Sequence, residues 1–181
     1  MPEPRRLVPV PAYIGLGANL DDPRRQVERA LAELAALPHS RLAACSPLYR
    51  TVPVGPRNQP DYVNAAARLD TRLAPADLLA ALQAVERCHG RVRDGSRWGP
   101  RTLDLDILLY GGMRLDQPGL HLPHAEMHRR AFVLVPLADI ADEDLPVPGH
   151  GTLGELLAGV GRAGIERLPA AAGEAGQTAL C

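Results

Sequence analysis

Two aspartates, Asp104 and Asp106, lie in a short apolar run that reads T-L-D-L-D-I-L-L-Y. Alternation with a period of two is typical of a strand, and it predicts both carboxylates on one face with Leu103, Leu105 and Ile107 on the other. Two residue rises of about 3.3 Å separate the two Cα atoms by roughly 6.6 Å. Both carboxylates can therefore reach one divalent cation or a pair of cations, and hard oxygen ligands favour Mg²⁺.

Four arginines and the only tryptophan precede this strand, at Arg91, Arg93, Arg97, Trp98 and Arg101. Guanidinium groups bind phosphate oxygens, and together with carboxylate-bound Mg²⁺ they supply what phosphoryl transfer requires. A strand with one solvated face beside a basic loop is the simpler interpretation of Asp-x-Asp alone, because a single short motif is weak evidence. The adjoining arginine-rich run makes phosphoryl transfer an equal alternative.

Composition narrows the choice of function. At 181 residues the chain is long enough for one domain with a substantial core. Its formal net charge of −1 gives no global attraction to nucleic acid or to an anionic membrane, so an anion site must depend on local arginines. The sequence contains no lysine, which excludes the P-loop and Schiff-base chemistries that need one.

The three cysteines, Cys45, Cys88 and Cys181, have no C-x-x-C spacing and predict neither a zinc site nor a disulfide framework. An apolar stretch at residues 7–20 follows two arginines as in a signal peptide, but prolines and glycines interrupt it and favour a strand. A run of about 18 apolar residues, which a membrane-spanning helix needs, is absent from the sequence. We expect a cytoplasmic monomer with reduced thiols and no nucleic-acid or membrane partner.

Alternating and helical patterns predict the elements that position these groups. Strands are predicted at residues 13–17, 42–49, 62–71 and 103–110, with helices at residues 23–37 and 75–89. Ser46 and Pro47 mark a bend or edge in the second strand. The order β-α-β-β-α-β predicts an α+β fold with a ferredoxin-like core, in which helices cover one face of an antiparallel sheet, plus C-terminal additions.

The additions follow the last of these strands. Residues 111–122 are predicted to form a turn and loop, residues 128–140 a helix that Pro136 should kink or end, and residues 152–160 a short last helix. We expect a loose lead-in at residues 1–11, a single catalytic domain at residues 12–160 and a flexible tail at residues 161–181.

A glycine motif and a group of histidines suggest other chemistry. G-L-G-A-N-L at residues 15–20 resembles a dinucleotide fingerprint, but Leu20 replaces the third glycine, and a tight turn into the first helix is favoured. His121, His124 and His128 resemble a metal cluster, although Pro123 interrupts any helical register and no partner has zinc-site spacing. One histidine that contacts phosphate beside the arginines at positions 129 and 130 is the favoured interpretation.

Aromatic residues make up only 3% of the chain, so an aromatic beside a loop is a candidate for stacking on a flat ligand. Tyr62 and Trp98 are in such positions, and core packing stays an equal alternative for Tyr62 and Phe132. Asn64 shares a strand face with Tyr62, and an amide beside an aromatic ring suits the edge of a heterocycle.

Several ordered blocks resemble the 6-hydroxymethyl-7,8-dihydropterin pyrophosphokinase family. They are R-W-G-P-R-T-L-D-L-D-I-L-L-Y-G, Y-I-G-L-G-A-N-L, S-P-L-Y-R-T-x-P-V-G, Q-P-D-Y-V-N-A-A and L-P-H-A-E-M-H-R-R-A-F-V-L-V-P-L, and the resemblance covers residues 13–157. It implies transfer of the pyrophosphoryl group of ATP to the hydroxymethyl oxygen of the pterin, with release of AMP, in folate biosynthesis. It also implies two Mg²⁺ ions and ATP as co-substrate.

The resemblance implies a role for individual residues. Asp104 and Asp106 would bind Mg²⁺, and Arg91 and Arg101 would contact phosphates. The nucleotide would be bound by Gln83, Glu86, Arg93, Trp98, Ile107, Leu120, His124 and Arg130, and the pterin by Thr51, Pro53, Val54, Tyr62, Asn64 and Phe132. Departures at Asp94, Gly119 and Ala125 imply a weaker affinity for ATP.

Two readings from other classes stay open at this point. A ferredoxin-like RNA-binding module would need exposed sheet aromatics and an RNP-type motif, which the sequence lacks. A regulatory domain that senses a small molecule could share the fold, but it would not need paired acids beside an arginine-rich loop.

Overall fold

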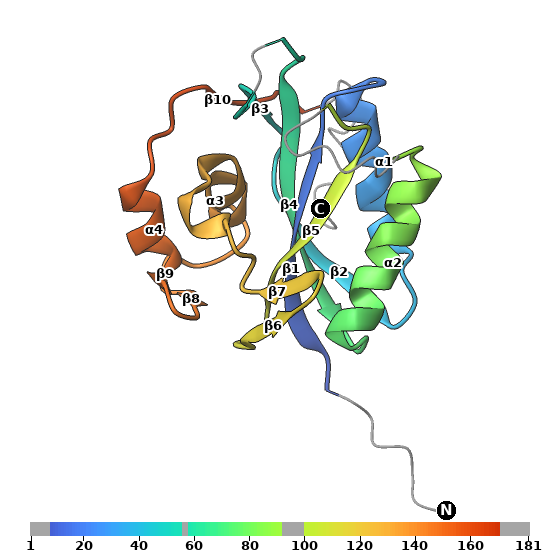
Figure 1. Ribbon diagram of the computed structural model, residues 1–181, viewed down its shortest axis with the longest axis vertical. Helices are drawn as coiled ribbons and strands as arrows, with labels where there is room; N and C mark the ends of the chain where they lie inside the picture. Colours follow the sequence, from blue (N-terminus) through green and yellow to red (C-terminus); the bar gives the residue numbers. More distant parts are fainter. Residues whose placement is uncertain (1–7, 56–57, 92–99, 171–181) are drawn as a thin grey trace, which may run out of the picture.

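The computed structural model describes residues 8–55, 58–91 and 100–170 and has three layers. A central antiparallel sheet carries helices α1 (Pro23–Ala35) and α2 (Pro75–Cys88) on one face. Helix α3 (Ala131–Ala138) packs on the other face, and α4 (Leu153–Gly159) lies against α3 (Figure 1). The C-terminal additions therefore cover the face that the predicted βαββαβ core leaves open.

The sheet is built around two long central strands, β1 (Val10–Ala18) and β4 (Tyr62–Thr71). Strand β5 (Asp104–Tyr110) pairs with the other side of β1. The far side of β4 pairs with both β2 (Ser40–Cys45) and β3 (Tyr49–Thr51), and all these pairs are antiparallel.

Ser46 separates β2 from β3, so the strand predicted at residues 42–49 is broken at its predicted bend. The Ser46 N–H donates to the Ala66 carbonyl at 2.8 Å, and the Ser46 hydroxyl accepts from the Ala66 N–H at 2.9 Å. These two bonds satisfy the backbone of β4 where the ladder is interrupted.

Local sequence explains both helices of the first face. Asp22 caps α1 by accepting a hydrogen bond from the Arg25 N–H at 3.3 Å, and Pro23 occupies the first turn. The apolar side of each helix is buried, including Leu34 of α1 and Leu82 of α2. These side chains join Ile14, Leu16, Leu105, Ile107 and their neighbours in what we name the first core.

The second core lies between the sheet and the C-terminal additions. It joins Tyr13, Leu108, Met127, Leu134, Leu137 and Leu153. Pro136 lies inside α3, two residues before the helix ends at Ala138. Helix α4 begins with a capping box between Thr152 and Glu155. It confirms the short last helix predicted at residues 152–160.

The structure has regular elements where the sequence predicts none. Residues 111–122, predicted to be a turn and loop, contain a hairpin of β6 (Leu115–Gln117) and β7 (Leu120–Leu122). Gly119 turns this hairpin with a φ of 81°, a conformation that favours glycine. Two short strands, β8 (Pro146–Val147) and β9 (Gly151–Thr152), and the 3₁₀ helix η1 (Met127–Arg129) complete the fold.

Strand β10 (Ile165–Arg167) falls inside the stretch predicted to be a flexible tail. It pairs with β3, and hydrogen bonds from the Val52 N–H to the Gly164 carbonyl (3.0 Å) and from the Leu168 N–H to the Leu48 carbonyl (2.8 Å) flank the pair. The prediction was wrong for these residues because β3 offers an unpaired edge, which composition does not reveal. The rest of that stretch from residue 171 on lies outside the described residues.

At the other end of the chain, β1 already begins at Val10, inside the predicted lead-in. Within the described part of the chain, no helix has both the length and the apolar character to cross a membrane.

Candidate active site

The sheet brings an amide, two glycines and two carboxylates into adjacent rows. Across β4, β1 and β5, Asn64 is paired with Gly17 and Gly17 with Asp104, while Gly15 is paired with Asp106 in the next row. Asp104 and Asp106 lie on the α3 face, whereas Leu103, Leu105 and Ile107 are buried in the first core. The predicted alternation of the strand is confirmed.

The two glycines lie inside β1, in agreement with the strand predicted at residues 13–17, and the chain turns into α1 after them. Asp21 and Asp22, whose φ angles are 52° and 59°, make this turn. A Cβ on Gly17 would lie 2.8 Å from the Asn64 side-chain nitrogen, and one on Gly15 would lie 3.2 Å from Leu108. A side chain at Gly17 would therefore displace the Asn64 amide, whereas one at Gly15 would require only a small shift of Leu108.

A cavity of about 620 Å³, here named the site cavity, lies over this face. Eleven of the residues with a predicted role line it, namely Thr51, Val54, Tyr62, Asn64, Arg91, Arg101, Asp104, Asp106, His124, Arg130 and Phe132. They come from β3, β4, β5, α3 and the connecting loops. The structure thus brings the predicted metal, phosphate and pterin ligands together in one cavity.

Five other predicted residues do not line the site cavity. Ile107 and Leu120 are buried in the first core, and Glu86 is buried on α2. Gln83 is half-buried on α2, and Pro53 is half-buried beside Val54 in the loop after β3. Arg93, Asp94, Arg97 and Trp98 lie outside the described residues.

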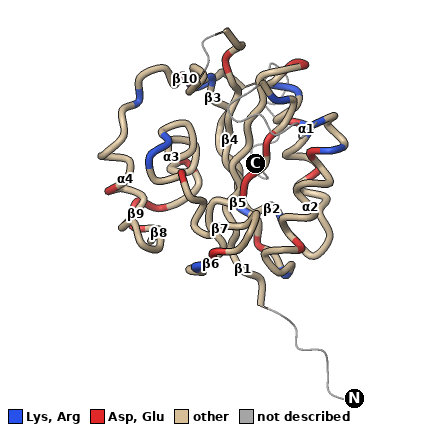
Figure 2. Tube along the Cα trace, viewed as in Figure 1, with Lys and Arg blue, Asp and Glu red and all other residues tan. Residues whose placement is uncertain are grey.

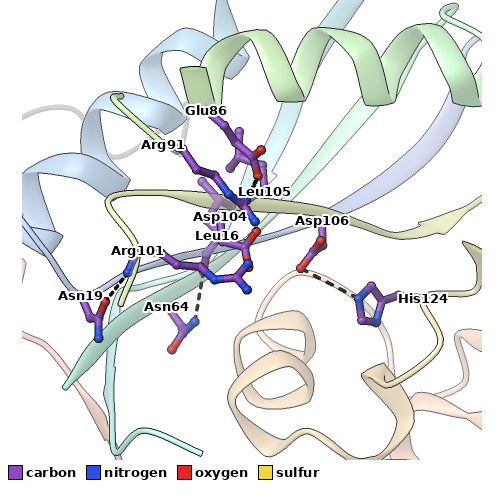
Figure 3. Close-up of polar contacts among 10 residues, drawn as sticks. All are labelled: Leu16, Asn19, Asn64, Glu86, Arg91, Arg101, Asp104, Leu105, Asp106 and His124. Carbon is purple, nitrogen blue, oxygen red and sulfur yellow. Dashed lines mark hydrogen bonds and ion pairs between the residues drawn. The ribbon is translucent and has the colours of Figure 1, made fainter. Parts of the chain in front are cut away.

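Asp104 is held by two arginines. It accepts hydrogen bonds from the guanidinium groups of Arg91 and Arg101, the latter at 3.0 Å. Arg91 also donates to Glu86, so one guanidinium group bridges two carboxylates (Figure 3). Burial opposes the charge of Arg91, but Asp104 and Glu86 outweigh it and raise the pKa of Arg91 above its ordinary value.

Glu86 is 1% exposed and lies behind Arg91 rather than in the cavity. Besides the Arg91 contact, its carboxylate accepts a hydrogen bond from the Leu105 N–H at 2.9 Å. A buried carboxylate is tolerated only when it is paired and hydrogen-bonded, and both conditions are met. Glu86 therefore fixes α2 to β5 at the residue between the two aspartates.

Among the described residues, no arginine lies within ion-pair distance of Asp106. Its carboxylate lies 3.9 Å from the Nε2 atom of His124 at the base of the site cavity. Burial at the base of the cavity, followed by the charges of Asp104 and Glu86, raises the pKa of Asp106 to about 7. Figure 2 shows this acidic stretch of β5 in the middle of the molecule. Concentrated negative charge of this kind favours binding of a cation.

His124 presents its Nε2 atom to Asp106. Its Nδ1 atom accepts a hydrogen bond from the Glu126 N–H at 3.2 Å, which places the proton of the neutral ring on Nε2. Burial and the charge of Arg130 lower the pKa of His124. The neutral ring therefore offers one N–H donor to the cavity, beside the guanidinium group of Arg130.

The other predicted histidines have different partners. His121 contacts Asp116 at 2.6 Å, and His128 stacks on His150 with ring centroids 4.2 Å apart. Among the residues described, no group of three or more His, Cys, Asp or Glu side chains is arranged to hold a metal ion. Two carboxylates remain a suitable set for Mg²⁺, which commonly binds one or two protein carboxylates and completes its shell with substrate phosphates and water.

Around Thr51 and Asn64, the site cavity is lined by a polar pair and by two aromatic rings. The Thr51 hydroxyl donates to the Asn64 carbonyl oxygen at 2.6 Å, and the Asn64 side-chain nitrogen donates to the Leu16 carbonyl at 3.3 Å. These bonds fix the orientation of a buried amide that can still accept and donate one bond each. Tyr62 and Phe132 line the same region, and the guanidinium carbon of Arg130 lies 5.8 Å from the Phe132 ring centroid.

One buried polar residue near the site was missed. Asn19 stands out in the sequence only as part of the motif at residues 15–20, but it is 1% exposed and bonded to segments on both sides of the site. An asparagine shortly before a helix is commonly a cap. Neither its residue type nor its position in the sequence therefore predicts that it joins two distant segments of the site.

Known proteins are similar to this chain over most of its length. The family described as 7,8-dihydro-6-hydroxymethylpterin-pyrophosphokinase (HPPK) matches residues 13–142. The chain is 58% identical over 159 residues to a Pseudomonas aeruginosa protein named 2-amino-4-hydroxy-6-hydroxymethyldihydropteridine pyrophosphokinase, covering 88% of this chain and 97% of that protein. A Haemophilus influenzae protein of the same name is 47% identical over 148 residues, covering 82% of this chain and 91% of that protein.

A solved structure extends the similarity to the fold. The Plasmodium falciparum HPPK-DHPS wild type with pteroate aligns with a TM-score of 0.65 at 13% identity, covering 83% of this chain and 42% of that chain. The present chain thus spans less than half of that protein, and the likeness concerns the fold alone. The family match and the two bacterial relatives are more specific, and together they establish that the chain belongs to the 7,8-dihydro-6-hydroxymethylpterin-pyrophosphokinase family.

Proposed function

We propose that the chain transfers the pyrophosphoryl group of ATP to the hydroxyl of 6-hydroxymethyl-7,8-dihydropterin, giving the pterin diphosphate and AMP. Family membership supports pyrophosphoryl transfer in folate biosynthesis. The observation that carries the proposal is one cavity with Asp104 and Asp106 at one end and the Thr51–Asn64 amide site at the other. Such a cavity can hold a phosphate chain and a flat heterocycle end to end.

Asp104 and Asp106 would hold two Mg²⁺ ions. Bound there, the ions would supply charge neutralisation for the phosphates and would lower the pKa of the attacking hydroxyl. Both oxygens of Asp104 are engaged by arginines in this structure, and each oxygen keeps a further lone pair for a cation. Arg91 and Arg101 therefore lie next to the place where phosphate oxygens would bind.

These two arginines would stabilise negative charge that develops as the bond to the β-phosphorus changes. Glu86 holds Arg91 in place from behind, so this guanidinium group is preorganised before the nucleotide binds. His124 would donate from Nε2 and Arg130 from its guanidinium group to the triphosphate. Catalysis would thus rest on positioning and electrostatics.

The pterin would bind at the other end of the cavity. Asn64 would bond the pyrimidine-like edge of the ring, and Thr51 orients that amide. Tyr62 and Phe132 would stack on the two faces of the ring, while backbone groups of Thr51 and Val54, with Pro53 beside them, would complete the pocket.

The adenine base of the nucleotide would bind beside Ile107 and Leu120. Ile107 and Leu120 are buried in the first core, so their backbone groups rather than their side chains would contact adenine. Gln83 and Glu86 would act near the nucleotide from α2. Arg93 and Trp98 would contribute from residues 92–99, which lie outside the described part.

We also infer a ferredoxin-like core within a single catalytic domain. Its support is the antiparallel order β5, β1, β4 and then β2 with β3, with both crossover helices on one face. A monomeric state and a cytoplasmic location stay predictions from the sequence.

Product analysis tests the proposed function. Wild-type protein with Mg²⁺, ATP and the hydroxymethyl-dihydropterin should release AMP and pterin diphosphate in equal amounts. Omission of the pterin or of Mg²⁺ should abolish both products. Release of ADP in place of AMP, or AMP without pterin diphosphate, would exclude pyrophosphoryl transfer to this acceptor.

A further inference from the structure

Asn19 follows β1 directly and is not among the residues that line the site cavity. Figure 3 shows its contact with Arg101. Its buried side chain contacts Arg101, which precedes β5, and residues 59–60, which precede β4. We propose that Asn19 is a positioning residue that couples the metal-and-phosphate half of the site to the pterin half. This inference rests on the proposed function for the identity of the two halves.

On the phosphate side, Asn19 fixes the backbone of Arg101. The Asn19 side-chain oxygen accepts from the Arg101 N–H at 2.7 Å, and the Asn19 and Leu20 N–H groups donate to the Arg101 carbonyl at 2.9 and 3.3 Å. The guanidinium group of the same arginine donates to Asp104 at 3.0 Å. Any shift of Asn19 therefore moves a residue that directly contacts the metal-binding face.

On the pterin side, Asn19 holds the loop that leads into β4. Its side-chain nitrogen donates to the Pro60 carbonyl and to the Gln59 side-chain oxygen, each at 3.1 Å. Tyr62, two residues beyond Pro60, is the first residue of β4 and lines the site cavity. The loop position therefore determines where the proposed stacking ring lies.

The orientation of the Asn19 amide is fixed by two backbone groups. The Arg101 N–H can only donate and the Pro60 carbonyl can only accept, so the oxygen faces Arg101 and the nitrogen faces the loop. Both protons of the Asn19 amide have acceptors, and Asn19 itself is only 1% exposed. A buried polar group with all its donors satisfied resists small displacements, because each displacement leaves a donor unpaired.

This geometry predicts coupling between the two ligands. A nucleotide that orders Arg101 also orders Asn19, and through it the loop that leads into β4 at Tyr62. Pterin binding then costs less ordering free energy, and the coupling is reciprocal because binding free energies are linked.

Three variants separate this role from general stabilisation. Asn19→Ala removes every side-chain bond of the network. Asn19→Asp keeps the acceptor for the Arg101 N–H but sets a carboxylate oxygen against the Pro60 carbonyl. Gln59→Ala serves as the matched control, because among the side-chain bonds of Asn19 it removes the one to Gln59 and leaves those to Pro60 and Arg101.

The test is calorimetric titration of the hydroxymethyl-dihydropterin with and without saturating Mg²⁺ and an ATP analogue that carries a methylene group between the α- and β-phosphorus atoms. In the wild type the nucleotide should raise pterin affinity by about fivefold or more, within the usual range of coupling. Asn19→Ala and Asn19→Asp should bring the factor close to one, and Asn19→Asp should keep its affinity for nucleotide alone. Gln59→Ala should keep most of the coupling.

An unchanged coupling factor in both Asn19 variants, whatever their melting temperatures, would overturn the inference. If Asn19→Ala does not fold, the coupling factors of Asn19→Asp and Gln59→Ala decide whether Asn19 couples the two halves of the site. A wild-type protein that binds both ligands without coupling would overturn this inference and leave the proposed function in place. A wild-type protein that binds neither ligand would overturn the proposed function, and the inference with it.

Discussion

Gly17 and Asp104 are direct partners in the β1–β5 pair, and on its other side Gly17 faces Asn64. The missing Cβ is what allows the Asn64 side chain to lie over β1, since a Cβ there would be 2.8 Å from the amide nitrogen. The floor of the site cavity is therefore made by backbone, with a carboxylate at one side and an amide at the other.

Gly17→Ala should displace the Asn64 side chain and weaken pterin binding about tenfold, which corresponds to about 1.4 kcal/mol. The measurement is pterin affinity by calorimetry. Gly112→Ala is the control, because a Cβ at Gly112 meets nothing within 4 Å. Equal pterin affinity in both variants would contradict a floor that requires glycine.

Thr51→Val should weaken pterin binding with little effect on nucleotide binding. The change keeps the shape of the side chain but removes the hydroxyl that donates to Asn64 at 2.6 Å, so the amide loses its fixed orientation. A buried hydrogen bond of this kind contributes about 1 kcal/mol to stability, so the free energy of unfolding should fall by about that amount. Thr51→Ser restores the hydroxyl and should restore pterin affinity; if it does not, the hydroxyl is not the cause.

Tyr49 should make stability depend on alkaline pH. Its hydroxyl donates to Asp139 at 2.6 Å, and burial together with that carboxylate raises its pKa to about 12. The folded pKa lies above the unfolded value of about 10, so the contribution is complete below pH 10 and is lost as pH rises toward 12. Urea unfolding at pH 8 should therefore show wild type more stable than Tyr49→Phe, by about 1.5–3 kcal/mol for a bond to a charged group.

At pH 11 the difference between wild type and Tyr49→Phe should shrink. Other tyrosines titrate equally in both proteins, so their contributions cancel in the comparison. A difference that stays constant from pH 8 to pH 11 would contradict the assignment of the raised pKa to the Asp139 contact.

Strand β10 should support the pterin half of the site, because it pairs with β3, the strand that carries Thr51. A chain ended after residue 160 should lose stability and pterin affinity together, with a smaller change in nucleotide affinity. A chain ended after residue 170 keeps β10 and is the control. Equal pterin affinity in the two shortened chains would exclude a role for β10 in the site.

Local rules were sufficient for the parts of the fold that depend on neighbouring residues. The Asp104–Asp106 face follows from period two, and the start of α1 follows from the cap at Asp22 and Pro23. The break at Ser46 between β2 and β3 also follows from local sequence, because Ser46 and Pro47 mark a bend.

Contacts between distant segments were not predictable in this way. The strand that contains Gly15 and Gly17 was predicted, but their pairing with Asn64, Asp104 and Asp106 depends on the register of β1 against β4 and β5. Strand β10 exists because β3 offers it an edge 110 or more residues earlier in the chain. Asn19 and Glu86 are polar residues whose burial depends on that same packing, so neither residue type nor local spacing reveals their partners.

Turnover of Asp106→Ala tests the metal face of the site most directly. AMP formation from ATP and the hydroxymethyl-dihydropterin is measured at saturating Mg²⁺ in wild type, in Asp106→Ala and in Asp144→Ala, which changes an exposed aspartate. Loss of the carboxylate should lower turnover by about a thousandfold or more, or about 4 kcal/mol of transition-state free energy, with the fold unchanged. Asp144→Ala should match wild type. A folded Asp106→Ala protein that turns over within about tenfold of wild type would contradict a site organised around this pair of aspartates.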